Sequence, residues 1–229
     1  MKLGIIAAMH NEAERIITAM TDTAVETVGG IRYTSGKLNG TDAVCAVCGI
    51  GKVFAAMCAE AMIITYKPDY IINSGIAGTL TSRLGIGDVA ISTDAVQHDM
   101  DTSAMGDPVG MISGIDIIKL PTSDMLGGKI ETIAHELGVN TVRGTIATGD
   151  RFIGDSETKK RISEAFGAVA CEMEGGAIAQ VCYVNGVPCS IIRAISDNAD
   201  GQALEDYPTF EKKAAALSAE ISIRLAQEL

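Results

Sequence analysis

Short apolar runs alternate with helix-forming stretches along this chain, and that alternation limits the possible folds more than any other feature. Runs typical of buried strands lie at residues 2–8, 70–73, 86–97, 141–148, 168–172 and 187–194. Residues 31–37 and 41–48 flank a Leu-Asn-Gly turn and predict a hairpin. Helices are expected at residues 11–20, 52–66, 124–137, 157–165, 174–185 and 209–228. Strands that alternate with helices favour an α/β protein with a mostly parallel sheet covered on both faces.

The length of 229 residues suits one α/β domain, so we predict a single domain over residues 1–229. With 47% hydrophobic and 21% charged residues, the chain can bury a sizeable core. Residues 99–123 carry Gly, Pro, Asp and Met without a clear period. A segment of this length without regular structure is usually functional, so we expect a long functional loop there.

The charge balance restricts the partners of the protein. The 18 Lys and Arg residues against 29 Asp and Glu residues give a formal net charge of −11. Such a charge repels phosphate, so nucleic acid and anionic membrane surfaces are not expected partners. No apolar run approaches the roughly 18 residues of a membrane span, and the first apolar stretch is too short for a signal peptide. We therefore expect a cytoplasmic protein.

Neither the cysteines nor the histidines are spaced like a metal site. Most of the six cysteines lie in apolar stretches, as is typical of reduced and buried residues. Cys45 and Cys48 form a CxxC pair, but residues three apart on a strand face opposite sides, and no second ligand pair accompanies them. His98 precedes Asp99 without a second histidine nearby. We expect no metal site and no redox role for these residues.

Ligands of such sheets bind at the carboxyl ends of the strands, so the polar residues that follow the apolar runs are the candidate site. Four segments qualify, at residues 9–12, 73–78, 171–175 and 193–197. The glycine-rich turns at 49–52 and 75–78 let a ligand approach the backbone. Neither turn has the spacing of a P-loop or of a dinucleotide-binding fingerprint.

Glu172 and Glu174 stand two residues apart at a strand-to-helix junction. If the strand geometry persists there, both carboxylates leave the same side of the sheet. Either could instead stabilise the positive end of the following helix. Met173 between them could pack on a flat or sugar-like ligand, or belong to the core.

Arg193 follows Ser-Ile-Ile at a predicted strand end and needs a buried partner, for which Glu12 and Glu174 are the candidates. An acid in a dry pocket has a raised pKa, so Asp197 could hold a proton near neutral pH and donate it. The alternative is that Asp197 only caps the following turn.

Six ordered segments over residues 4–200 resemble the bacterial 5′-methylthioadenosine/S-adenosylhomocysteine nucleosidases of the nucleoside phosphorylase family: GIIAAMHNE, GIGKV, INSGIAG, ATGDRFI, EMEGGAIA and RAISDNAD. The resemblance implies a three-layer αβα fold with a mixed central sheet flanked by helices. It also implies a cofactor-free hydrolase that splits the N-glycosidic bond of 5′-methylthioadenosine, S-adenosylhomocysteine and 5′-deoxyadenosine. Such an enzyme releases adenine and serves methionine salvage.

By the same resemblance, Asp197 is the acid that protonates adenine, and Ser196 orients it. Glu12 is expected to activate the attacking water, aided by Arg193. Glycosidic cleavage passes through an oxocarbenium-like state, which suits carboxylates placed around a sugar. The other substrate-binding positions that the resemblance implies are Met9, Ile50, Ile76, Gly78, Phe152, Ile153, Glu172, Met173, Glu174 and Tyr207.

Within that set, Phe152 and Ile153 match the segment that holds adenine, Glu174 matches the ribose ligand, and Tyr207 sits at the aromatic lid position. Members of the family are dimers in which the long loop of one subunit closes the pocket of the other. The neighbouring subunit's contributors would be Thr102, Met105 and Ser113, and the apolar helix at 52–66 is compatible with a dimer interface or with the core.

The chain departs from the family motif at Ile76, where a serine is common, and at Met105 and Ser113, where aromatic residues or proline are common. Both departures bear on substrate preference. Two other enzymes of the same fold stay open as alternatives, an aminofutalosine-type nucleosidase and a phosphate-dependent nucleoside phosphorylase. A carboxylate such as Glu12 at the nucleophile position would repel phosphate. A non-catalytic nucleoside sensor would lack the acid or the water-activating residue, and this chain has both.

Overall fold

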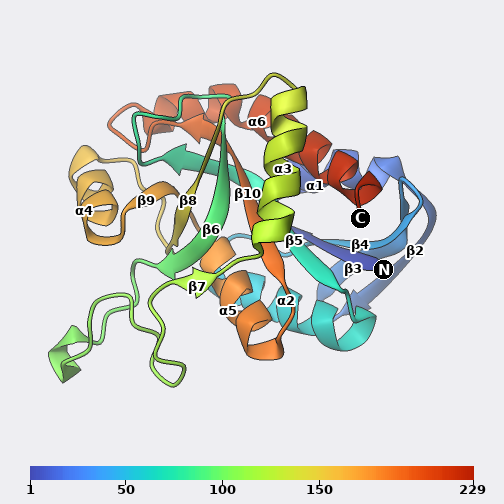
Figure 1. Ribbon diagram of the computed structural model, residues 1–229, viewed down its shortest axis with the longest axis horizontal. Helices are drawn as coiled ribbons and strands as arrows, with labels where there is room; N and C mark the ends of the chain where they lie inside the picture. The colour runs from blue at the N-terminus through green and yellow to red at the C-terminus, as the bar shows by residue number, and fades with distance from the viewer.

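The expected α/β alternation is present in the computed structural model, which describes residues 1–229 (Figure 1). The strands are β1 (Lys2–Ala7), β2 (Met20–Val28), β3 (Ile31–Leu38), β4 (Thr41–Val47), β5 (Tyr70–Thr79), β6 (Val89–Gln97), β7 (Leu120–Pro121), β8 (Thr141–Thr148), β9 (Ala168–Glu172) and β10 (Cys189–Asp197). The helices are α1 (His10–Ala19), α2 (Lys52–Tyr66), α3 (Asp124–Glu136), α4 (Ser156–Phe166), α5 (Gly175–Asn185) and α6 (Ala203–Gln227). A single 3₁₀ turn, Ser103–Met105, interrupts the long loop after β6.

The strands form one ten-stranded sheet in two parts that share β5. On one side of β5, the order continues through β1, β4, β3 and β2. On the other side, β5, β10, β6, β8 and β9 close into a ring, because β9 pairs back with β5. The ring gathers the ends of β5, β9 and β10 around one point.

The sheet is mixed, as the family resemblance implied, but the expectation of a mostly parallel sheet is wrong. Five strand pairings are parallel and five are antiparallel. Two causes are visible in the topology. The β2–β3–β4 meander is joined by tight turns, which force antiparallel pairing, and closure of the ring brings strands of opposite direction side by side.

Helices cover both faces of the sheet (Figure 1). The first core contains the buried side of α1, α3 and α6, and the second contains that of α2 and α5. Cys45 packs in the first core and Cys48 in the second, so the expected opposite orientation of the two thiols is confirmed. Helix α4 packs on β8 and β9 at the end of the ring. None of the helices combines the length and apolar content that crossing a bilayer would require.

The structure differs from the sequence expectation in an additional strand and in several element boundaries. Strand β2 was not expected, because most of its side chains are exposed and show no apolar alternation. Helix α6 begins at Ala203 instead of residue 209, with Pro208 inside the helix. Strands β5 and β10 continue through Thr79 and Asp197, so the polar segments expected just beyond the strands are themselves buried strand ends.

The joint between the sheet and α2 offers a test of the packing. Tyr33 of β3 is fully buried, and its hydroxyl donates a 3.0 Å hydrogen bond to the Cys58 carbonyl oxygen of α2. The Tyr33→Phe variant keeps the ring and loses the donor, so we expect the free energy of unfolding to fall by about 1 kcal/mol. Urea denaturation followed by circular dichroism measures the difference.

Tyr66→Phe is the matched control, because its hydroxyl bonds Glu26 at the exposed surface, at 3.1 Å. We expect this variant to stay within about 0.5 kcal/mol of the wild type. Equal losses in the two variants would contradict a specific contribution from the buried bond.

Candidate active site

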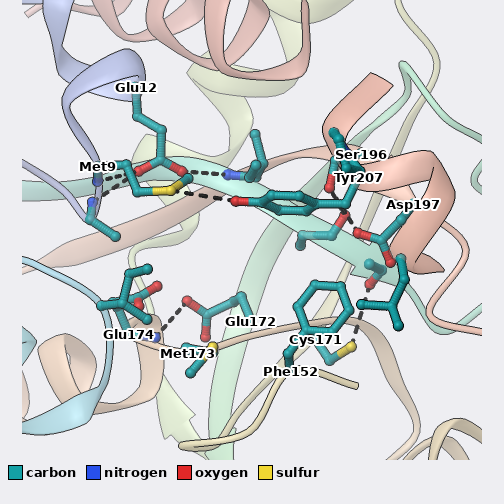
Figure 2. A pocket seen from close by; sticks show the side chains of 17 residues that line it. Met9, Glu12, Phe152, Cys171, Glu172, Met173, Glu174, Ser196, Asp197 and Tyr207 are labelled. Carbon is teal, nitrogen blue, oxygen red and sulfur yellow. Dashed lines mark hydrogen bonds between the residues drawn. The ribbon is translucent and has the colours of Figure 1, made fainter. Parts of the chain in front are cut away.

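A cavity of about 490 Å³ opens where the carboxyl ends of β1, β5, β9 and β10 meet the start of α6. Its wall combines apolar side chains with carboxyl groups, and side chains from distant parts of the sequence point into it (Figure 2). The expected site residues that line it are Met9, Glu12, Ile50, Ile76, Gly78, Phe152, Glu172, Met173, Glu174, Ser196, Asp197 and Tyr207. The cavity therefore collects residues from all four segments that the sequence singled out.

Glu12 is held by backbone amides at the start of α1. Its Oε2 accepts hydrogen bonds from the amides of Ala8 and Met9, both at 2.9 Å, and its Oε1 accepts one from Ile76 at 3.2 Å. Burial raises the pKa of Glu12, and the nearby Arg193 and the three amides act against that rise. Although Ile76 has no hydroxyl, its amide still reaches the carboxylate.

Arg193 is 1% exposed and lies behind the cavity wall. Its guanidinium forms an ion pair with Glu172 and a hydrogen bond with the Asn73 side chain, and its Nη2 is 3.9 Å from Glu174 Oε2. The sequence suggested Glu12 or Glu174 as its partner, whereas Glu172 makes the closest contact. This pairing was missed because β9 and β10 are distant elements in the sequence pattern. They come close only because both strands pair with β5 when the ring closes.

Gly75 separates Glu12 from Arg193. A Cβ atom at Gly75 would lie 2.8 Å from Glu12 Oε1 and 2.9 Å from Arg193 Nη1. Both distances are too short for non-bonded atoms, so only glycine at this position lets the two charged groups approach each other across β5.

Glu172 uses its oxygens on protein donors. They accept hydrogen bonds from the Thr148 hydroxyl, from the Glu174 amide at 3.0 Å and from the Gly175 amide at 2.7 Å. The ion pair with Arg193 adds to these bonds. The two amides belong to the start of α5, so the Glu172 carboxylate stabilises the positive end of that helix. The helix-end interpretation thus describes Glu172, while its side chain also forms part of the cavity wall.

Glu174 points into the same cavity and accepts a 2.9 Å hydrogen bond from the Gly51 amide at the start of α2. Gly51 has φ of +99°, a backbone conformation that favours glycine. Burial and the neighbouring Glu172 raise the pKa of Glu174 to about 7. Glu174 is thus poised to change its charge near neutral pH.

Asp197 lies at the end of β10, where a register shift after Ile195 sets it opposite Gly78 of β5. Its Oδ2 accepts a hydrogen bond from Ser196 Oγ, and its Oδ1 accepts one from the Ala199 amide, both at 2.9 Å. Burial raises the pKa of Asp197. The turn-capping interpretation is confirmed by the bond from the Ala199 amide, and the carboxyl group also faces the cavity.

Aromatic side chains frame the cavity near Asp197 (Figure 2). The rings of Phe152 and Tyr207 meet edge to face, with centroids 5.7 Å apart. The Tyr207 hydroxyl donates to Met9 Sδ at 3.4 Å. Ile153 lies outside the main cavity and lines a small adjoining recess of about 30 Å³ with Phe152 and Asp197.

The sequence assigned no individual role to five wall residues, namely Ala8, Ala77, Cys171, Leu204 and Pro208. Ala77 and Cys171 lie inside the candidate segments 73–78 and 171–175, and Ala8 directly precedes the segment 9–12, which was an available signal. Pro208 had only its place next to Tyr207 as a signal, and Leu204 had none, because the last helix was expected to begin after both residues.

Thr102, Met105 and Ser113 do not line this cavity. The hydroxyls of Thr102 and Ser113 donate to Asp107 Oδ2 at 2.8 and 3.5 Å, and Met105 is 76% exposed. Their loop projects away from the body of the protein (Figure 1).

Comparison with known proteins gives consistent matches over the full chain. The family model described as "Phosphorylase superfamily" matches residues 2–227. A 5′-methylthioadenosine/S-adenosylhomocysteine nucleosidase from Shewanella loihica is 39% identical over 230 residues, which cover 100% of both chains.

Two solved structures from Helicobacter pylori are also similar. One is an aspartate-to-asparagine variant of the enzyme MTAN with 5′-methylthioadenosine in its active site, at a TM-score of 0.95 and 35% identity, covering 100% of this chain and 99% of that one. The other is a futalosine hydrolase, at a TM-score of 0.95 and 34% identity, covering 100% and 98%. The three-layer αβα fold class is therefore confirmed.

The pKa of Glu174 makes stability depend on pH. Because its pKa is about 7 in the folded chain against an ordinary 4.5, the folded state binds the extra proton between those values. Stability from this group is therefore lost as the pH rises through that range. We expect Glu174→Gln, which mimics the protonated form, to gain stability relative to the wild type as the pH rises from 5 to 8.

Urea denaturation at several pH values measures this difference. Glu14→Gln, on the exposed face of α1, is the control for removal of a carboxylate away from the cavity. A Glu174→Gln difference that does not change between pH 5 and 8 would contradict the raised pKa of Glu174.

Proposed function

The chain belongs to the phosphorylase superfamily, and we propose that it is a nucleosidase that hydrolyses the N-glycosidic bond of 5′-methylthioadenosine and S-adenosylhomocysteine. We include 5′-deoxyadenosine as a third substrate. The observation that carries the proposal is that two buried carboxyl groups of raised pKa, Glu12 and Asp197, face one cavity from different walls (Figure 2). One can take a proton from water while the other gives a proton to a leaving base.

In the proposed reaction, Asp197 protonates adenine as the bond to ribose breaks. Adenine is a poor leaving group as an anion, and a positioned acid contributes about 10²–10⁴ in rate. Burial keeps the proton on Asp197 at a higher pH than in water. Ser196 and the Ala199 amide hold the two oxygens of the carboxyl group in place.

Glu12 is the proposed base for the attacking water. Burial strengthens it as a base, while three amides and Arg193 stabilise the ionised form that must accept the proton. Carboxylates on both sides of a sugar suit the positive charge that develops on ribose in the transition state.

The remaining wall residues are proposed to hold the substrate. Glu174 accepts the ribose hydroxyls, Met173 packs on the sugar, and Phe152 stacks on adenine. Ile153 reads the edge of adenine through its backbone, and Tyr207 covers the pocket. The similar MTAN that holds 5′-methylthioadenosine in its active site supports a nucleoside as the ligand.

Two enzymes of the same fold compete with this proposal. A nucleoside phosphorylase would place phosphate where Glu12 stands, and the carboxylate there disfavours it by charge repulsion. A nucleosidase that acts on an aminofutalosine-type substrate is the second candidate, because a futalosine hydrolase is 34% identical to this chain. Assays of adenine release with and without phosphate, and with aminofutalosine as a further substrate, separate the three enzymes.

We further propose that the protein is a cytoplasmic homodimer and that residues 1–229 act as one domain. Helices α2 and α5 pack together and expose apolar side chains, which would be covered in a dimer: Val53, Phe54, Met57, Ile64, Tyr183 and Val184. The long loop of one subunit would then bring Thr102, Met105 and Ser113 to the partner's pocket.

The central test is adenine release by the purified protein, with and without phosphate. We expect release from 5′-methylthioadenosine and S-adenosylhomocysteine at rates that phosphate does not change. A requirement for phosphate would make the protein a phosphorylase. Release from aminofutalosine alone would favour the second candidate.

Two variants test the assigned roles. Asp197→Asn cannot supply the proton and Glu12→Gln cannot accept one, so we expect kcat to fall at least about 100-fold in each. Both substitutions preserve the size and shape of the side chain, so calorimetry should still detect binding of 5′-methylthioadenosine. Glu14→Gln is the control for charge on α1. A variant that turned over at the wild-type rate would lose its proposed role.

A further inference from the structure

The turn that follows Asp197 has an unusual backbone. Ala199 is fully buried and has φ of +49°, in the left-handed region that residues with a Cβ rarely adopt. In this conformation its amide donates a 2.9 Å hydrogen bond to Asp197 Oδ1. The arrangement that holds the carboxyl group of Asp197 therefore requires a backbone that has to be stabilised from outside.

Lys159 of α4 supplies a contact at this point. Its Nζ donates a 2.6 Å hydrogen bond to the carbonyl oxygen of Asn198. That carbonyl and the Ala199 amide belong to one planar peptide unit, in which C=O and N–H point in opposite directions. Lys159 thus fixes the carbonyl end of the unit while the amide end is aimed at Asp197.

The positive charge of Lys159 also strengthens this arrangement. A charged donor on a carbonyl oxygen polarises the peptide unit, which makes its N–H a stronger donor. On the other side of the turn, a Cβ atom at Gly78 would lie 2.6 Å from Asp197 Oδ1 and 2.9 Å from the Ala199 side chain. The turn is therefore packed tightly between β5 and α4.

We propose that Lys159 is a positioning residue for Asp197, acting through the Asn198–Ala199 peptide unit. The inference rests on the proposed function, in which Asp197 is the general acid. Lys159 does not line the cavity, so it acts without touching the substrate.

The other charged groups around Asp197 come from several elements. Asp200 in the turn and Asp206 of α6 raise its pKa by charge repulsion. Cys171 of β9 and Glu172 face the same recess, as does Arg151 from the loop after β8. The positive charge of Lys159 also acts on the residues of this recess. Burial raises the pKa of the Cys171 thiol, and Lys159 acts against that rise.

The sign of the expected pH effect follows from these contacts. The Ala199 amide lowers the pKa of Asp197 against the effect of burial. Loss of Lys159 weakens that hydrogen bond, so the pKa of Asp197 rises. Because the general acid must be protonated, the alkaline limb of the kcat/KM profile moves to higher pH.

The experiment compares Lys159→Met, Lys159→Gln and Lys159→Arg in adenine release from 5′-methylthioadenosine between pH 5 and 10. We expect Lys159→Met to lower kcat about 10-fold and to move the alkaline limb up by about one pH unit. Lys159→Gln keeps a neutral donor and should lie between, while Lys159→Arg keeps the charge and should restore the wild-type limb. Lys160→Met is the matched control, because Lys160 is exposed and lies 3.8 Å from Glu164 alone.

Wild-type protein that releases no adenine would overturn the proposed function and this inference with it. An active wild type whose alkaline limb is unmoved in Lys159→Met overturns the inference alone, even if kcat falls. If Lys159→Met does not fold, the Gln and Arg variants decide, and equal limbs in those two variants overturn the inference.

Discussion

The buried guanidinium of Arg193 is the interaction on which the site depends. An isolated charge at this depth would be too costly, so the surrounding structure has to supply carboxylates. Glu12, Glu172 and Glu174 all raise the pKa of Arg193, against the effect of burial. Burial raises the pKa values of Glu12 and Glu174, and for Glu174 the neighbouring Glu172 carboxylate adds to that rise.

The fold creates this cluster through the ring of strands. Glu172 comes from β9 and Arg193 from β10, and both strands pair with β5. Gly75 of β5 leaves space for Arg193 to approach Glu12 at the start of α1. The same strands end at the cavity, so the elements that neutralise Arg193 also form the wall that would face a nucleoside.

Helix ends and turns then fix the individual carboxyl groups. The start of α5 binds Glu172, the start of α2 binds Glu174, and the start of α1 surrounds Glu12. Asp197 is held differently, by a turn whose backbone is itself held by Lys159. Each group thus has an orientation set by backbone amides, which move less than side chains do.

Much of this could be predicted from the sequence, and the rest could not, for physical reasons. Apolar periodicity located most of the strands and helices, and the segments after them contained Glu12, Glu174, Arg193 and Asp197. Strand β2 could not be predicted, because its residues are mostly exposed and show no apolar periodicity.

The sequence by itself determined the α/β class, the four segments that form the site and the need of Arg193 for a buried partner, because periodicity and the cost of a buried charge are local properties. Only the tertiary structure decided that the partner is Glu172, that β10 turns out of register to face Gly78, and that Lys159 reaches the Asn198 peptide. Those contacts join residues distant in sequence, and they depend on which strands pair when the sheet closes.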